Sequence, residues 1–244
     1  MSTQSGPAGV AARWHHLHLT APDPAAAADW YAEQLGGRRH DVGEYELALF
    51  DGHFFTWYGS QGYPPSQGSV IDHFGWSVPD LEKTMERLVA AGATALDGPR
   101  TVGDVQLKIS FLEDPWGAKL ELLEDAHLPG FHHVHVVTAG PAAERNWWLD
   151  RFGGEAARFK GLVDGIRHPR FWILFRESPG ETAATVGRAI DHLGLQVDDV
   201  DAACRTLAER KDALECEPAA FGSNRFAFLS SPAGVRIELF QVGG

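Results

Sequence analysis

The stretch HHLHLTAPDPAAAADWYAEQLGG (15–37) decides the fold, because it occurs twice in the chain. Its second copy is HHVHVVTAGPAAERNWWLDRFGG (132–154), which repeats the spaced histidines, the proline, the aromatic residues and the closing glycines. From His16 to His133 the copies are offset by 117 residues. This offset indicates duplicated domains rather than a solenoid, in which repeats recur about every 20–50 residues.

Two further segments are repeated in the same order. They are DHFGWSVPDLEKTMERLVAAGA (72–93) with DHLGLQVDDVDAACRTLAERKDA (191–213), and FLEDPWGAKLELLE (111–124) with FLSSPAGVRIELFQ (228–241). Because His16 and His73 each open a similar strand–helix segment, the deeper unit is a module of roughly sixty residues, used four times.

Each module should contain one strand, one helix and three more strands. In the first module, alternation predicts a strand over 14–20, and Asp23 before Pro24 predicts a helix that ends at Gly36. Further strands are expected near 38–42, 44–51, 53–58, 71–78, 94–98, 104–112, 118–123, 131–138 and 189–197, with a second helix from about 80 to 92. This order predicts an α+β fold, with helices outside curved antiparallel sheets.

Two histidines and one glutamate recur with nearly equal spacing in each half of the chain. The sets are His16, His73 and Glu121, at intervals of 57 and 48 residues, and His133, His192 and Glu238, at intervals of 59 and 46. Two imidazoles and one carboxylate can hold one face of a divalent metal and leave other positions open for exchangeable ligands. Structural zinc is normally enclosed by four ligands, often thiolates. The sequence therefore predicts one catalytic metal triad in each half.

Other histidines are candidates for further roles. His18 and His135 lie two residues beyond predicted ligands and so share their face of the strand. They are expected to act as acid–base residues, as hydrogen-bond partners of the ligands, as alternative ligands, or as the polar lining of a wet cavity. His53 is a candidate proton donor if it faces the cavity, and otherwise a surface residue. His15 and His132 should point the other way.

In these segments the chain resembles the vicinal oxygen chelate superfamily, which includes glyoxalase I, bleomycin-resistance proteins and type I extradiol dioxygenases. The resemblance implies tandem glyoxalase/bleomycin-resistance/dioxygenase-like domains, each made of two paired βαβββ modules that form a half-open barrel around a metal. It assigns both triads to the places of the family's ligands. The domains are expected at 13–124 and 131–242, joined by a linker at 125–130, after a flexible tail at 1–12. Because each domain pairs two modules internally, a monomer or a homodimer is expected.

The resemblance leaves three kinds of function open. The first is Fe(II)-dependent, dioxygenase-like oxidation of a small oxygen-bearing molecule by O₂, although extradiol enzymes carry a tyrosine where Phe111 and Phe228 stand here. The second is redox-neutral glyoxalase, epimerase or lyase chemistry with a Lewis-acid metal, for which Mn(II), Zn(II), Ni(II) or Co(II) would also serve. The third is a non-catalytic resistance protein that binds a small molecule, although such members commonly lack the triad.

Composition excludes several partners. The formal net charge of −12 disfavours nucleic acid and anionic membranes, and no apolar stretch is long enough to span a membrane. The N-terminus does not read as a secretory signal. Only two cysteines are present, Cys204 and Cys216, and they form no CxxC pair, which suggests a reducing compartment and a cytoplasmic location.

Overall fold

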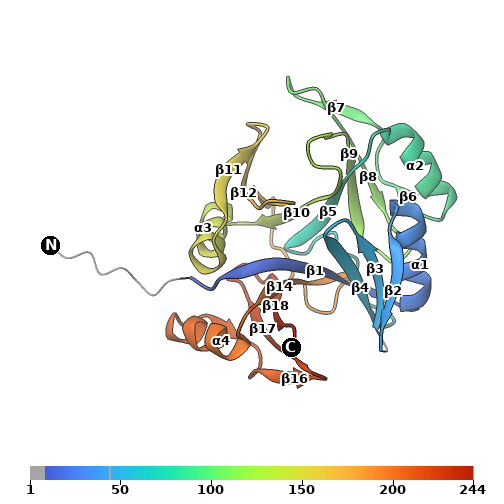
Figure 1. Cartoon of the computed structure of the whole chain (residues 1–244). Coiled ribbons are helices and arrows are strands. Elements are labelled where there is room, and N and C mark those ends of the chain that lie inside the picture. The colour runs from blue at the N-terminus through green and yellow to red at the C-terminus, as the bar shows by residue number, and fades with distance from the viewer. Residues whose placement is uncertain (1–8, 44, 244) are drawn as a thin grey trace.

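The computed structural model describes residues 9–43 and 45–243, so most of the predicted flexible tail over 1–12 lies outside the described residues. Four modules follow one another along the chain (Figure 1). The first contains β1 (Ala12–Ala21), α1 (Pro24–Leu35), β2 (Arg38–Val42), β3 (Tyr45–Phe50) and β4 (His53–Gly59). The third contains β10 (Gly130–Thr138), α3 (Pro141–Phe152), β11 (Glu155–Phe159), β12 (Val163–Arg167) and β13 (Trp172–Glu177).

The even-numbered modules have one short strand more than the sequence predicts. The second contains β5 (Ile71–Ser77), α2 (Leu81–Ala90), β6 (Thr94–Ala95), β7 (Arg100–Val102), β8 (Leu107–Glu113) and β9 (Lys119–Leu123). The fourth contains β14 (Ile190–Val197), α4 (Val200–Glu209), β15 (Ala213–Leu214), β16 (Ala219–Phe221), β17 (Asn224–Ser230) and β18 (Arg236–Gln241).

Three of the helices begin at an aspartate whose side chain accepts a backbone N–H of the first turn. Asp23, Asp80 and Asp199 accept from Ala26, Lys83 and Ala202 at 3.1, 3.0 and 2.8 Å. These bonds satisfy N–H groups that have no partner inside the helix. Helix α1 ends at Gly36 in the left-handed conformation, at φ 74°, as predicted.

The modules pair in two nine-stranded sheets. The first sheet joins the first and fourth modules, with β1 antiparallel to β14, β4 parallel to β1, and β18 parallel to β14. The second sheet joins the second and third modules, with β10 antiparallel to β5, β13 parallel to β10, and β9 parallel to β5. Figure 1 places β5, β9 and β10 above β1, β14 and β18. The fold is α+β, with tandem domains built from paired βαβββ modules.

This pairing corrects the expected grouping of the metal ligands. Each half of the sequence was expected to close its own triad, but the strands that carry the ligands pair between halves, because the outermost modules of the chain share one sheet. The division at 125–130 stays a prediction, since β9 and β10 on either side of it belong to the same sheet. Both sheets are formed by the same chain.

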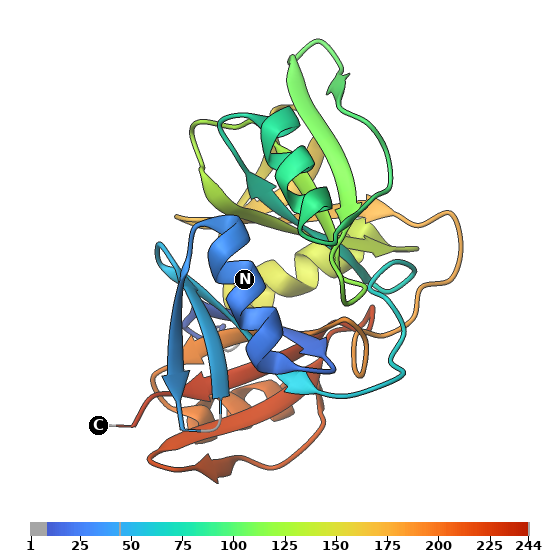
Figure 2. The same ribbon diagram turned by 90° about the vertical axis from the view of Figure 1, so that its right-hand side faces the viewer.

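Two connections carry the chain between the sheets, and they lie side by side. Val70 donates its backbone N–H to Ala183 at 2.8 Å, and Ala183 donates to Gly68 at 3.0 Å. Helix α1 lies at the junction of the two sheets (Figure 2), and its Tyr31 contacts Phe55 and Phe74 in one continuous core. In the described residues no helix is long and apolar enough to cross a membrane.

Candidate metal centres

Strand register brings the six predicted ligands into two clusters. In the first sheet His16 lies opposite Gly194, and Gly194 lies beside Glu238, while His192 lies opposite His18. A side chain at Gly194 is excluded, since an added Cβ would stand 2.1 Å from the ring of His16. Gly75 plays the same part under His133 in the second sheet, also with 2.1 Å. The glycine of each DHxG motif therefore makes room for a ligand from the facing strand.

The first centre consists of His16, His192 and Glu238. The Nε2 atoms of His16 and His192 are 3.3 Å apart, and they lie 3.1 and 3.3 Å from Glu238 Oε2. Metal–ligand bonds of about 2.0–2.2 Å at right angles place neighbouring ligand atoms roughly 3.0 Å apart. These three atoms are thus spaced as three ligands on one face of a divalent cation.

The second centre consists of His73, His133 and Glu121. Glu121 Oε2 lies 3.1 Å from His73 Nε2 and 3.3 Å from His133 Nε2. His135 adds a fourth candidate, because its Nδ1 is 3.2 Å from His73 Nε2 and all four ligand atoms lie within 4.8 Å of one another. Both centres join residues from opposite halves of the sequence.

In each of the four ligand histidines, Nδ1 lies within hydrogen-bond distance of the side chain of the preceding residue. Asp191 and Asp72 accept from His192 and His73 at 2.7 Å. His15 and His132 lie 2.9 and 2.8 Å from Nδ1 of the histidines that follow them. The four residues that hold Nδ1 are the unpaired positions of β-bulges, where the strand register shifts. A bulge interrupts strict alternation, so the expectation that His15 and His132 point away was wrong.

The donor set fits a cation. Since the Asp191 carboxylate accepts a hydrogen bond from Nδ1–H of His192, the Nε2 atom presents a lone pair toward the Glu238 carboxylate. His133 Nε2 is buried and makes no hydrogen bond with the described residues. Lone pairs and a carboxylate this close, away from water, repel one another unless a cation or proton lies between them.

The pKa shifts follow from this arrangement. Burial lowers the pKa of His192 and His73, but bonds to the aspartates and glutamates outweigh it, so both are raised. At His16 and His133 burial dominates and the pKa is lowered, to about 4 for His133. Burial alone would raise the pKa of Glu238, yet the facing histidines hold it below its ordinary value. The glutamates therefore stay ionised, as ligands should.

His18 lies beside the first centre, as predicted from its strand position. Its ring stacks on Tyr58 and on His192, with centroids 3.8 and 4.3 Å apart. Its Nε2 atom is buried and has no hydrogen-bond partner among the described residues. Burial and the neighbouring histidines hold its pKa well below the ordinary value, so His18 is neutral near pH 7. At the second centre, burial and the neighbouring His73 and His133 likewise hold the pKa of His135 well below its ordinary value.

The first centre opens on a cavity of about 500 Å³. His16, His18, Thr56 and Glu238 line its metal end, whereas Asn224 lines it at the far end, where it accepts the backbone N–H of Gly243 at 2.9 Å. Aromatic rings form most of the remaining wall: Tyr45, Phe54, Tyr58, Phe221, Phe226, Phe228 and Phe240. His40 and His15 also line it, although no role there was predicted for them. The cavity can therefore admit a small molecule to the metal ligands.

The corresponding space in the second sheet is filled by side chains. Leu107, Ile109, Leu123, Phe159 and Leu174 pack there as a buried apolar cluster. Leu174 stands at the register position of Thr56, opposite His135 rather than His18. We call these five residues the plug. The two centres thus have matching ligands but different access.

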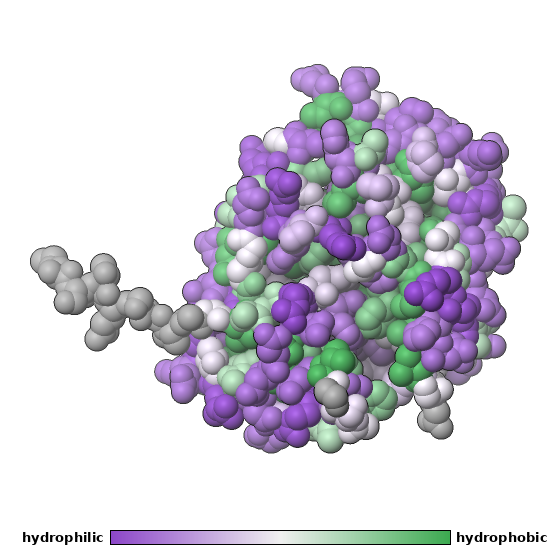
Figure 3. Space-filling view, in the orientation of Figure 1, coloured by the Kyte–Doolittle hydropathy of each residue, from purple (hydrophilic) through white to green (hydrophobic). Residues whose placement is uncertain are grey.

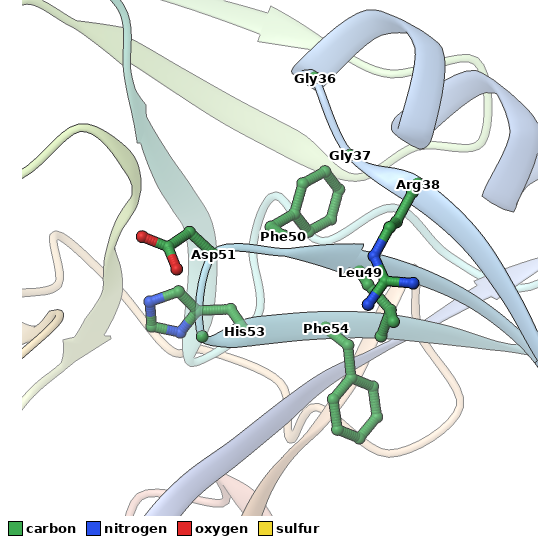
Figure 4. Close-up of a pocket in the computed structure, with 9 residues that line it drawn as sticks. Gly36, Gly37, Arg38, Leu49, Phe50, Asp51, His53 and Phe54 are labelled. Carbon is green, nitrogen blue, oxygen red and sulfur yellow. The ribbon is translucent and has the colours of Figure 1, made fainter.

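The structure does not bring His53 to either centre. His53 and Phe54 lie on opposite sides of β4 (Figure 4), and only Phe54 faces the metal cavity. His53 lines a separate hollow of about 660 Å³ and packs 5.1 Å from the ring of Phe131. Burial, with a contribution from Arg170, lowers its pKa to about 4. Its predicted role as a proton donor at the metal is not supported by this position.

Comparison with known proteins gives a family match over most of the chain. The family model described as Glyoxalase/Bleomycin resistance protein/Dioxygenase superfamily matches residues 13–122 and 130–239. The protein named "Probable lactoylglutathione lyase, chloroplastic" from Arabidopsis thaliana is 34% identical over an alignment of 131 positions, which covers 48% of this chain. The match spans only 37% of that relative's length.

A solved structure shares the fold over nearly the whole chain. Glyoxalase I from Zea mays superimposes with a TM-score of 0.75 and covers 95% of this chain and 92% of its own, at 17% identity. At that identity the likeness establishes the arrangement of the elements and not the reaction.

Proposed function

The chain belongs to the Glyoxalase/Bleomycin resistance protein/Dioxygenase superfamily, and on this premise we propose that it is a divalent-metal-dependent enzyme of the redox-neutral kind. Its reaction class would be that of glyoxalases, epimerases and lyases, carried out at the first centre on a small oxygen-bearing molecule. The observation that carries the proposal is the contrast between the centres: the ligands of the first open on a cavity, and those of the second face the plug.

His16, His192 and Glu238 would hold the metal. A divalent metal with open positions supplies a Lewis acid that polarises a substrate carbonyl or stabilises negative charge on its oxygen. The protein's part is to orient these ligands. Asp191 and His15 do so by fixing which nitrogen of each ligand faces the cavity.

His18 is suited to move the proton. It is neutral, lines the cavity, and its Nε2 atom has no hydrogen-bond partner in the described ranges. It could therefore accept a proton from the substrate carbon beside the carbonyl and return it to a neighbouring atom. The aromatic walls would exclude water from the exchange.

Fe(II)-dependent oxygenation, which the sequence pattern put first, depends on the same triad. The Arabidopsis relative supports the redox-neutral alternative instead, since it is named a probable lactoylglutathione lyase. Metal identity stays a prediction. So does a cytoplasmic location, because the Arabidopsis relative is chloroplastic.

The test is proton exchange next to a carbonyl. Protein purified without oxygen is loaded with Zn(II), Ni(II) or Fe(II), and exchange of the carbon-bound proton of 1-hydroxy-1-phenylpropan-2-one is followed in D₂O by NMR. We expect metal-dependent exchange that falls at least 100-fold in His18→Ala, the size typical of losing a general base. Exchange should also fall in Glu238→Gln, because that variant loses a metal ligand.

Glu121→Gln is the matched variant, because it makes the same chemical change at the second centre. It should keep most of the exchange rate. Equal losses in Glu238→Gln and Glu121→Gln would contradict the assignment of activity to the first centre. Metal-dependent O₂ consumption without proton exchange would favour the oxygenase instead.

A further inference from the structure

We propose that the first centre takes an uncharged substrate with an aromatic or apolar body, and not an anionic conjugate such as a glutathione adduct. This inference rests on the proposed function, because it assumes that the cavity is the reaction site. It concerns the part of the substrate that lies away from the metal.

Among the residues that the structure describes, the cavity offers neither a lysine nor an arginine to a substrate carboxylate, and the basic side chains that line it are imidazoles. Arg236 does not line the cavity. Its guanidinium lies 3.9 Å from the centre of the Phe228 ring and forms ion pairs with Asp191 at 3.0 Å and Glu215 at 2.8 Å. A buried carboxylate without a partner is strongly disfavoured, and a glutathione adduct carries two.

The mouth of the cavity is apolar as well. Of the ten exposed large apolar side chains among the described residues, five line this cavity: Val42, Tyr45, Tyr58, Phe221 and Val242. Tyr45 and Phe221, from the first and fourth modules, meet at 4.9 Å between ring centroids. Apolar residues break the polar surface in this lower part of the molecule (Figure 3). Clustered exposed apolar residues mark a surface that binds an apolar group.

Two buried polar atoms near the metal ligands are available to form a hydrogen bond with a substrate. His18 Nε2 and Thr56 Oγ1 are buried, line the cavity and make no hydrogen bond with the described residues. At the register position of Thr56, the second sheet has Leu174, which belongs to the plug. A buried hydroxyl without a partner costs free energy, so a substrate oxygen that bonds to it would recover that loss. A substrate oxygen is therefore expected at the metal end.

The overall charge of the molecule also disfavours an anionic substrate. The formal net charge of −12 repels anions at long range, and Glu238 adds a carboxylate at the base of the cavity. A bound divalent cation attracts anionic groups only at the metal end. A carboxylate at the far end would face mostly aromatic and aliphatic side chains.

The experiment compares two ligands of equal shape on the zinc-loaded protein. 4-Methylcatechol and 3,4-dihydroxybenzoate carry the same neighbouring oxygens, and differ in a methyl or a carboxylate at the far end. We expect calorimetry to show one 4-methylcatechol per chain, bound at least tenfold more tightly than 3,4-dihydroxybenzoate, and no binding of S-hexylglutathione over the same concentration range. Equal or tighter binding of either anion, or no binding of 4-methylcatechol, would overturn the inference.

Two variants test whether the ligands bind in this cavity. Val42→Lys supplies a cation at the mouth and should narrow the ratio between the two ligands at least fivefold. Thr56→Leu copies the second sheet and should weaken 4-methylcatechol at least tenfold while leaving the thermal unfolding midpoint close to that of the parent. If neither variant changes the ratio or the affinity, the ligands bind elsewhere and the inference fails.

Metal content separates this inference from the proposed function. Elemental mass spectrometry reports whether the centres hold metal. Absence of metal after loading sinks the proposed enzyme, but ligand quenching of tryptophan fluorescence still compares the two ligands on the metal-free protein. If the metal is at full occupancy and the uncharged ligand is not preferred, the proposed substrate class is wrong, and the proposed function is unaffected.

Discussion

At the scale of single residues, the groups that hold the ligands matter as much as the ligands. Asp191 is buried and bonds at once to His192, Arg236 and the backbone N–H of Gly187. Its carboxylate fixes the His192 ring and makes its Nε2 a better donor to a metal. Asp72, bonded to His73 and Lys119, does the same at the second centre.

We expect Asp191→Asn to weaken metal binding at the first centre about 10- to 100-fold, the range typical of lost hydrogen-bond support to a ligand. The measurement is competition for zinc with a chromophoric chelator. Asp72→Asn is the matched control and should weaken only the second centre. Unchanged affinity at both centres in Asp191→Asn would show that the aspartate does not support a ligand.

A second buried acid lies between the modules. Asp114, in the turn between β8 and β9, accepts the hydroxyl of Tyr31 at 2.7 Å and the backbone N–H groups of Trp116 and Ala118 at 2.9 and 2.7 Å. Burial raises its pKa from 3.8 to about 6, and these hydrogen bonds oppose the shift only in part. Folding therefore favours its protonated form.

The sign of the pH effect follows from that shift. The stabilising contribution of protonated Asp114 is fully present below about pH 4 and is lost as pH rises to about 6. Asn accepts the same backbone bonds without a charge. We expect the free energy of unfolding of Asp114→Asn, relative to wild type, to be about 2–3 kcal/mol higher at pH 7 than at pH 4. Urea unfolding at both pH values measures this, and a pH-independent difference would contradict it.

At the scale of elements, the strands were predictable and their bulges were not. Alternation located β1, and Asp23 before Pro24 located the start of α1. However, a bulge adds one unpaired residue to a strand. At His15 this extra residue turns its side chain toward the ligand His16, which strict alternation does not predict. The repeated HH and DH pairs were the available signal, because two adjacent polar residues do not fit a strand with one buried face.

The plug is another property of elements, because facing strands build it. Leu174 is 2% exposed, whereas Thr56 at the matching position has a hydroxyl without a partner among the described residues. We expect Leu174→Ala to lower the free energy of unfolding by about 2–4 kcal/mol, the cost of a cavity in a packed core. Thr56→Ala should cost less than about 1 kcal/mol, because it removes no satisfied bond. Chemical denaturation measures both, and equal costs would show that the plug is not packed.

At the scale of the whole molecule, the sequence showed which segments are alike but not which ones meet. All four modules start similarly, so pairing the first with the second or with the fourth satisfies the same alternation and the same ligand types. The choice is made by contacts that no local pattern contains. Among them are the bond from Tyr31 to Asp114 and the pairing of the connections at Val70 and Ala183.

Paired substitutions distinguish the two arrangements by counting metal. His16 and Glu238 belong to one centre in the structure, although they lie at opposite ends of the chain. His16→Ala/Glu238→Ala should therefore remove one metal and keep the other, whereas His16→Ala/Glu121→Ala should remove both. If each half of the sequence closed its own triad, these outcomes would be exchanged. Elemental mass spectrometry on the two variants, with circular dichroism to confirm that both are folded, decides how four similar modules assemble into two centres.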